Sequence, residues 1–294
     1  MHLSTVEAVL EYEVKEPTHF CFNLQAAQWP TQNLLSEHLE VTPGIAVRSH
    51  VDARSGNRFL RFDAPAGPLR LHYKADVEVF AESVDAALAE VPVREVPDDI
   101  FPYLLATRYC ESDRMAAQAQ QLFGALPQGL ARVRAIVQWV HEHIAYRLGS
   151  TGPTTTASEV LAQRAGVCRD FAHLAITFCR ALSIPARMVV GYVWFDEPPQ
   201  DFHAVFEAWL GGRWVLFDAT GMAPVDRLVR TGTGGDAKDV AFCTYFGNVA
   251  LVRKEVWVLE HDPRAAPSGP ALAPAAPVPA DSALVRRVGA IEPA

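Results

Sequence analysis

The first 80 residues consist of short segments in which apolar and polar residues alternate, separated by turn residues. In the clearest segment, residues 69–80, apolar residues occupy every second position from Leu69 to Val79, and polar residues lie between them. A period of two is typical of β-strands with one buried face. Further strands are predicted at residues 9–14, 19–24, 38–41, 45–51 and 59–63. Short strands at regular spacing predict an all-β sandwich.

Beyond residue 110 the apolar residues are spaced three or four positions apart instead. This spacing predicts amphipathic helices over residues 114–123, 130–146 and 168–182. Alternating segments then predict strands at residues 187–195, 202–210, 214–220 and 249–259. Helices combined with antiparallel strands in this way predict an α+β domain.

Residues 90–102 separate the two regions, because they combine prolines with a cluster of acidic residues, as domain boundaries often do. At the other end, 17 of the last 33 residues are alanine or proline, and aromatic residues are absent. Such a segment lacks the apolar area needed to offset its ordering entropy. We therefore predict a β-sandwich over residues 1–95, an α+β core over residues 96–261 and a disordered tail over residues 262–294.

Composition and charge exclude several classes of function. Half of the residues are apolar and 20% are charged, which is typical of a globular protein. A net charge of −8, without long basic runs, argues against nucleic acid as a partner. The N-terminus has no signal-peptide pattern, and no segment has the roughly 18 consecutive apolar residues of a membrane span. We therefore expect a cytoplasmic protein without a membrane partner.

Five cysteines without a Cys-x-x-Cys pair favour reduced thiols over a disulfide framework or a zinc site, so we expect no metal and no cofactor. Cys168 has a position suited to chemistry, because Gly166 ends a loop and the predicted helix begins at Cys168. Backbone N–H groups and the helix dipole favour a thiolate on that first turn. We interpret the other four cysteines as structural; they are Cys21, Cys110, Cys179 and Cys243.

A thiolate nucleophile needs a base that is oriented by a third group. The dipeptide Gly211-Gly212 predicts a two-residue hairpin turn. In the resulting register His203 and Asp218 are diagonal neighbours on one face, about 7–8 Å apart at the backbone and within side-chain reach. A three-residue loop would instead send them to opposite faces. From these residues alone, a structural histidine is the alternative for His203.

Four segments together resemble the bacterial branch of the transglutaminase-like superfamily. They are Gly-Val-Cys-Arg-Asp-Phe-Ala-His-Leu from residue 166, Ala-Leu-Ser-Ile-Pro-Ala-Arg-Met-Val-Val-Gly-Tyr from residue 181, Phe-His-Ala-Val-Phe-Glu-Ala-Trp-Leu from residue 202 and Gly-Arg-Trp-Val-Leu-Phe-Asp-Ala-Thr from residue 212. The resemblance is strong over residues 133–220 and implies a papain-like fold for the core. It also implies that Cys168 is the nucleophile, His203 the general base and acid, and Asp218 the orienting carboxylate.

The chain departs from the family pattern at Val205, where members often have tryptophan, and it has no acidic loop with calcium-ligand spacing. An oxyanion hole needs a second donor besides the backbone N–H of Cys168, and Tyr146, upstream of the nucleophile, is our candidate. Asp170 is a candidate substrate contact. The alternative for Asp170 is an acid of the first helical turn that the dipole stabilises.

Other conspicuous residues have simpler interpretations. We expect His141 and His143 on the surface, since they are two positions apart on a predicted helix, and His173 in packing. Trp209 and Trp214 are predicted to pack against each other across the hairpin. The glycine-rich segment 232–235 lacks the Gly-Lys-Ser/Thr of a phosphate loop, and we interpret it as a linker.

We therefore predict cysteine-dependent acyl transfer, through a thioester, on a peptide or protein substrate that carries an amide. Water as the acceptor would give a peptidase or amidase, and an amine would give a transglutaminase. The lack of calcium features favours hydrolysis. The alternative from another class is a catalytically silent binding or scaffold module with the same fold. The sequence indicates no particular oligomeric state.

Overall fold

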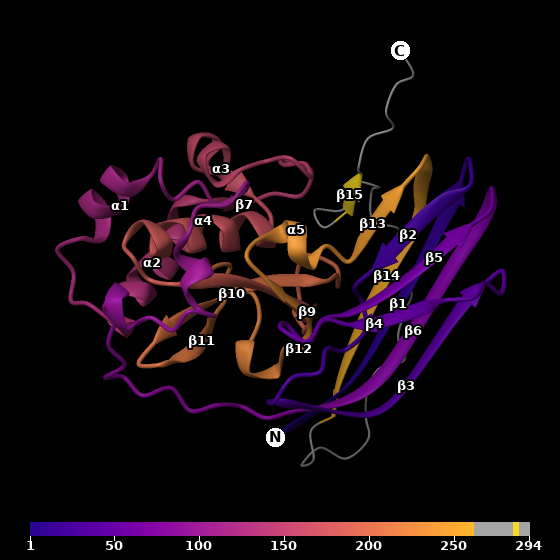
Figure 1. The fold of residues 1–294 in the computed structure, drawn as a ribbon, viewed down its shortest axis with the longest axis horizontal. Coiled ribbons are helices and arrows are strands. Elements are labelled where there is room, and N and C mark those ends of the chain that lie inside the picture. The colour runs from indigo at the N-terminus through magenta and orange to yellow at the C-terminus, as the bar shows by residue number, and fades with distance from the viewer. Residues whose placement is uncertain (262–284, 288–294) are drawn as a thin grey trace.

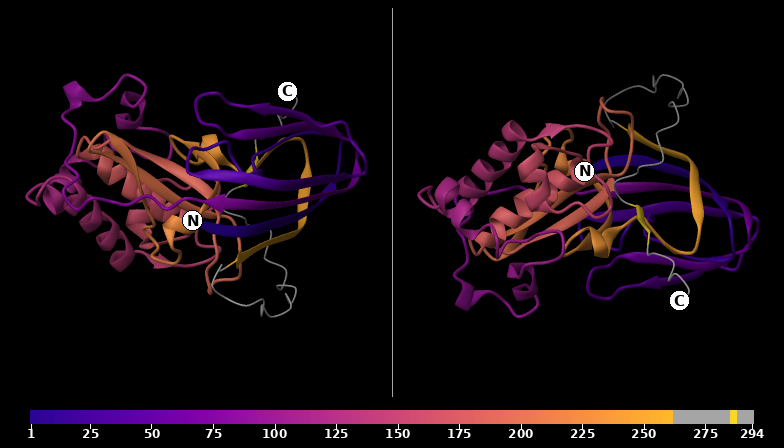
Figure 2. Two further views of the ribbon diagram at one scale, coloured as in Figure 1. Left: turned by 90° about the horizontal axis from the view of Figure 1, so that it is seen from below. Right: turned by 90° about the horizontal axis from the view of Figure 1, so that it is seen from above.

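The computed structural model describes residues 1–261 and 285–287. A β-sandwich lies at one end of the molecule and a mixed region of helices and strands at the other (Figures 1 and 2). The fold is α+β, with an antiparallel β domain beside a papain-like core, as the sequence predicted.

The sandwich consists of two facing sheets. The first has the order β14-β1-β6-β3, with β14 (Val249–His261), β1 (His2–Val14), β6 (Gly67–Val79) and β3 (Gln32–Thr42). The second has the order β15-β13-β2-β5-β4, with β15 (Val285–Arg287), β13 (Cys243–Phe246), β2 (Thr18–Phe22), β5 (Arg58–Ala64) and β4 (Arg48–Val51). Alternate residues of β6 from Leu69 to Val79 are buried, as the period of two predicted. Stacked aromatic rings fill the interior, including Phe20 and Phe62, whose centres are 5.6 Å apart.

Two strands from the C-terminal part of the chain belong to this sandwich, which corrects the predicted domain boundary. β14 pairs with β1 from Leu3↔His261 to Val14↔Val249, and β13 pairs with β2. The core therefore does not extend to residue 261, because β13 and β14 supply strands to the N-terminal domain. Of the predicted disordered tail, residues 285–287 form β15, which pairs in parallel with β13, and the rest lies outside the described residues.

The core places a buried helix on a four-stranded sheet. The sheet has the order β11-β10-β9-β12, with β11 (Arg213–Phe217), β10 (His203–Leu210), β9 (Ala186–Tyr192) and β12 (Val229–Gly234). Helix α4 (Cys168–Ala181) packs against β9 and β10 and is buried from Cys168 to Arg180. The helices around α4 are α1 (Ala116–Phe123), α2 (Leu130–His143) and α3 (Ala157–Gln163), and α5 (Ala237–Val240) packs on β12 (Figure 1).

Two elements of the core differ from the sequence expectation. Residues 232–234 of the segment interpreted as a linker belong to β12, whose six residues are all buried, and Gly235 follows the strand. Glycine is required there because the chain packs closely: a Cβ on Gly234 would lie 2.3 Å from Cβ of Asp239. Helix α2 ends at His143 instead of continuing to residue 146. The next residues form β7 (Ala145–Tyr146), which pairs in parallel with β8 (Ala165–Gly166).

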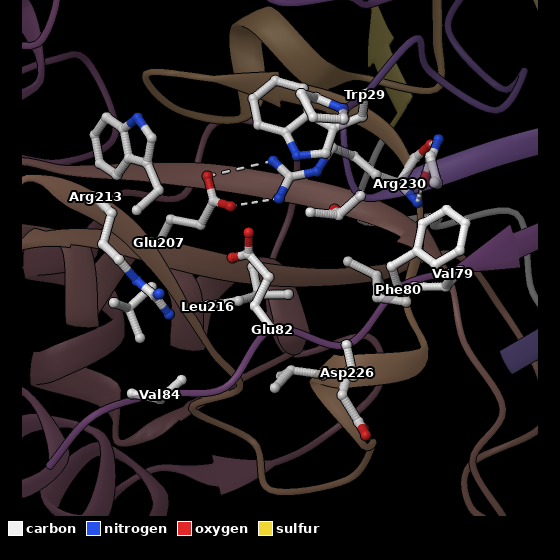
Figure 3. A pocket seen from close by; sticks show the side chains of 18 of the residues that line it. Trp29, Val79, Phe80, Glu82, Val84, Glu207, Arg213, Leu216, Asp226 and Arg230 are labelled. Carbon is white, nitrogen blue, oxygen red and sulfur yellow. Dashed lines mark hydrogen bonds and ion pairs between the residues drawn. The ribbon is translucent and has the colours of Figure 1, made fainter. Parts of the chain in front are cut away.

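A pocket of about 360 Å³ lies where the sandwich meets the core sheet (Figure 3). Buried Glu207 forms ion pairs with Arg187 and Arg230 beside it, and the Arg230 guanidinium lies 4.1 Å from the centre of the Trp29 ring. Burial opposes the charge on Glu207, but these arginines hold its pKa below the ordinary value. The pocket is lined by neither Cys168 nor the histidine and aspartate predicted to act with it. We therefore assign the charge cluster to the interface between the two domains.

Candidate active site

Cys168 is the first residue of α4, as predicted, and a network of hydrogen bonds around Asp170 holds that end of the helix. The Asp170 carboxylate accepts a hydrogen bond from the Val167 backbone N–H at 2.9 Å and another from Thr151 Oγ1 at 2.5 Å. Arg169 donates to the other oxygen of Asp170 through Nε and Nη2, at 2.9 and 2.7 Å. Asp170 is completely buried, and this arrangement favours the alternative of an acid in the first helical turn over contact with substrate.

The hairpin of β10 and β11 brings His203 and Asp218 together. Gly211 and Gly212 both have positive φ, +57° and +79°, as a type I′ turn requires. The pairs Leu210↔Arg213 and Trp209↔Trp214 confirm the predicted two-residue turn. The tryptophans of the second pair are in contact, with ring centres 5.2 Å apart.

The ladder ends at Phe217, and the chain then turns around the Asp218 carboxylate. Asp218 Oδ2 is 3.0 Å from His203 Nε2 and accepts a hydrogen bond from the Ala223 N–H at 3.1 Å. Its other oxygen accepts hydrogen bonds from Thr220, through the backbone N–H at 2.8 Å and Oγ1 at 2.7 Å. Every oxygen of this carboxylate is therefore held in place, which fixes its orientation toward the imidazole.

His141 contacts the loop around Asp218, a contact that the sequence did not reveal. It is exposed, as expected, but its Nδ1 donates a hydrogen bond to the Thr220 carbonyl at 2.8 Å. Because Thr220 itself holds Asp218, His141 braces the loop from the end of α2. His173 is fully buried, as predicted, with its ring stacked 5.1 Å from Tyr109.

The pair of His203 and Asp218 has a charge distribution suited to proton transfer. Burial alone would lower the pKa of His203, but hydrogen bonds to Asp218 and to Cys168 outweigh it and raise the pKa to about 10. Burial likewise opposes the charge on Asp218, yet the hydrogen bonds from His203 and Thr220 hold the pKa of this carboxyl below its ordinary value. The imidazole is thus poised to carry a positive charge between a carboxylate and a thiol.

Tyr146, on β7, lies near Cys168 at the start of α4. Its pairing with Gly166 across the β7–β8 ladder brings it close to the start of α4, where Cys168 is among the groups that act on the pKa of its phenol. Burial, followed by the charge of the Cys168 sulfur, raises the pKa of Tyr146, so the phenol keeps its proton. A neutral hydroxyl can donate a hydrogen bond to an anion that forms beside the nucleophile.

The other four cysteines lie in surroundings that suppress the thiolate, and all five thiols are free. Burial raises the pKa of Cys110 to about 11, and it raises the pKa of Cys21, Cys179 and Cys243 as well. None of these four is hydrogen-bonded to His203. Cys168 therefore differs from them through its position at the helix terminus and its imidazole neighbour.

Within the residues that the structure describes, no helix combines the length and the apolar character needed to cross a membrane.

Comparisons with known proteins agree with this architecture. Residues 116–219 match the Transglutaminase-like superfamily, and residues 2–99 match the domain described as "Bacterial transglutaminase, N-terminal domain". The first match contains Cys168, His203 and Asp218, and its last residue is the one after Asp218.

A solved structure described as "a Putative Cysteine Protease from Cytophaga hutchinsonii" is similar to most of the chain. It is 38% identical, with a TM-score of 0.86, and the match covers 90% of this chain and 93% of that chain. An uncharacterized protein of Mycobacterium leprae is 26% identical over 249 residues, 78% of this chain and 88% of its own length. An uncharacterized protein of Mycobacterium bovis is 37% identical over 122 residues, 37% of this chain and 39% of its own length. The chain belongs to the transglutaminase-like superfamily, with a bacterial transglutaminase N-terminal domain before its core.

Proposed function

We propose that this protein catalyses acyl transfer from amides, with Cys168 as nucleophile, His203 as general base and acid, and Asp218 as the orienting carboxylate. One observation carries the proposal: His203 is hydrogen-bonded to Asp218, and the Cys168 thiol at the start of a buried helix acts on the same imidazole and raises its pKa. This is the order of nucleophile, base and orienting group that covalent catalysis by a thiol requires.

In the first half of the reaction the Cys168 proton passes to His203, and the thiolate attacks the amide carbonyl carbon. The carbonyl oxygen becomes an oxyanion, which the Cys168 backbone N–H and the Tyr146 hydroxyl would stabilise. When the tetrahedral intermediate collapses, the C–N bond breaks and His203 gives its proton to the departing amine. A thioester on Cys168 remains.

In the second half His203 removes a proton from the acceptor, which attacks the thioester carbonyl. Collapse of the second intermediate breaks the C–S bond and returns the proton to the sulfur. Water as acceptor gives a carboxylic acid, whereas a primary amine gives a new amide. We favour water, and therefore a peptidase or amidase, because the sequence has no loop with calcium-ligand spacing.

The acceptor can be identified by incubating the full chain with a library of glutamine-containing peptides, with and without a primary amine, and following the products by mass spectrometry. Hydrolysis of the backbone gives shortened peptides, and deamidation gives a mass gain of about one dalton. Amine adducts instead would overturn the preference for hydrolysis while leaving the proposed nucleophile intact. Turnover that persists in a Cys168→Ala variant would contradict the mechanism itself.

Replacing Tyr146 with phenylalanine tests the proposed second donor to the oxyanion. We expect kcat to fall by roughly 10²–10³-fold with little change in KM, because the hydroxyl acts chiefly on charge that develops in the transition state. Steady-state kinetics on a peptide identified by the library give both constants. Tyr245→Phe, a change in β13 of the sandwich, is the matched control and should behave as wild type. An equal loss in both variants would argue that Tyr146 contributes through packing alone.

A further inference from the structure

Lys254 occupies a core-facing position of the β-sandwich. It lies on β14 opposite Leu10, a fully buried residue of β1, and it shares its face of the strand with buried Val256 and Val258. Only 5% of Lys254 is exposed. A charged ammonium group at such a position is unfavourable unless an opposite charge compensates it. A lysine at this position therefore needs a negatively charged partner.

That partner is Asp201, in the segment that leads from β9 into β10. Lys254 Nζ forms an ion pair with Asp201 Oδ2, and Asp201 Oδ1 accepts a hydrogen bond from the Phe202 backbone N–H at 2.7 Å. The Phe202 ring stacks on Phe242 with centres 4.9 Å apart, and Lys254 Nζ lies 5.9 Å from the centre of that same Phe242 ring. His203 follows Phe202 directly, so the sandwich contacts the core two residues before the proposed base.

The charge of Asp201 also reaches the proposed oxyanion site. It is a lesser contribution to the raised pKa of Tyr146, after burial and the neighbouring sulfur, which is consistent with a carboxylate two residues before His203 that lies within electrostatic range of the Tyr146 hydroxyl. A negative charge there would disfavour both a Cys168 thiolate and the oxyanion of the tetrahedral intermediate. Compensation of that charge by Lys254 therefore favours the proposed reaction.

We propose that Lys254 is a positioning residue for the active site: it neutralises Asp201, so that the charge of this carboxylate, two residues before His203, does not oppose the thiolate and the oxyanion. The inference rests on the proposed function. In this arrangement the β-sandwich contributes to the chemistry of the core through one buried lysine.

Three variants of the full chain test this role by kinetics. Lys254→Met leaves Asp201 uncompensated, and we expect kcat to fall roughly 10- to 100-fold with a smaller change in KM. Asp201→Asn removes the harmful charge along with the pair, and we expect kcat to stay within about threefold of wild type. The double variant should recover most of the activity that Lys254→Met loses. Lys254→Arg, which keeps the charge, should resemble wild type, and Lys74→Met, a half-exposed lysine of β6, is the control.

A second measurement needs no substrate, so it separates this inference from the proposed function. The alkylation rate of Cys168 by iodoacetamide is followed against pH, with peptide mapping to distinguish Cys168 from the buried cysteines. The midpoint of this profile should move to higher pH in Lys254→Met and return in the double variant. These shifts are expected even if no amide substrate is ever turned over.

A purely structural ion pair predicts a different pattern. Removing either partner of the Lys254–Asp201 ion pair would then have the same effect. Lys254→Met and Asp201→Asn would lower kcat equally, and the double variant would not regain the kcat of wild type. That result, or an unchanged alkylation profile in a folded Lys254→Met protein, would overturn the proposal. Should Lys254→Met fail to fold, as judged by thermal melting, Lys254→Gln allows the same comparison with Asp201→Asn.

Discussion

Replacing Cys168 with alanine is expected to abolish amide turnover, with kcat reduced by about 10⁴-fold or more. The sulfur is the atom that would form the thioester, and Cys168 is the thiol that acts on the pKa of His203. Cys168 is 6% exposed and lies at the start of α4, so alanine removes the thiol while preserving the backbone of the helix terminus. Turnover of a peptide from the glutamine library is the measurement.

The matched control is Cys21→Ala, in β2 of the sandwich, which should keep wild-type kinetics because Cys21 lies in the other domain. Thermal melting of both variants establishes that each is folded. A folded Cys168→Ala protein with wild-type turnover would mean that another residue is the nucleophile. If wild type and variant are equally inactive toward every amide but bind the same peptides, the binding-module alternative would be favoured over the enzyme.

The hairpin that carries His203 was predictable from the sequence because a single local feature determines it. Two adjacent glycines can both adopt positive φ, a two-residue turn sets the register, and the period of two then decides which side chains share a face. The start of α4 was predictable for a similar reason, since a glycine before an amphipathic segment indicates a helix terminus. Each of these expectations depends on residues that are neighbours in the sequence.

The features that the sequence did not reveal depend on contacts between distant segments. β12 lacks the usual strand composition, because its glycines are there to let the chain pack against Asp239 and Asn23. β14 was expected as a strand, but its alternation carries no information about its partner β1. Lys254 lies in such a strand as a polar residue on the buried face, and only the position of Asp201 explains it.

One helix absent from the sequence-based prediction, α3, has a recognisable start in the sequence. Helix α3 begins after Thr156, whose backbone N–H donates to Glu159 Oε2 at 2.8 Å in a capping box. The pattern Thr-x-x-Glu before an apolar segment predicts such a helix start. The position of Tyr146 had no comparable signal, because its place beside Cys168 results from a two-residue ladder between β7 and β8. Short ladders of this kind have no periodicity to detect.

Replacing Asp218 with asparagine is expected to lower kcat by about 10⁴-fold at neutral pH, because the amide cannot stabilise an imidazolium or hold the required tautomer. The substitution should also shift the alkaline limb of the profile of activity against pH to lower pH. In wild type His203 must be protonated to donate to the leaving amine, so activity should decline as pH rises through about 10, the pKa of His203. Without the carboxylate, the effect of burial lowers that pKa, and the decline should begin at lower pH.

The same pKa has a consequence for stability, which provides an independent readout. Because the pKa of His203 is raised in the folded protein, the stabilisation from its pairing is complete below the unfolded value of about 6.5 and is lost as pH rises through about 10. Wild type should therefore lose melting temperature between these pH values more steeply than Asp218→Asn. Asp226→Asn, at a half-exposed position outside the triad, is the control and should retain the wild-type slope. Identical slopes in Asp218→Asn and wild type would show that Asp218 does not hold a charged imidazole, and the raised pKa of His203 would then need another cause.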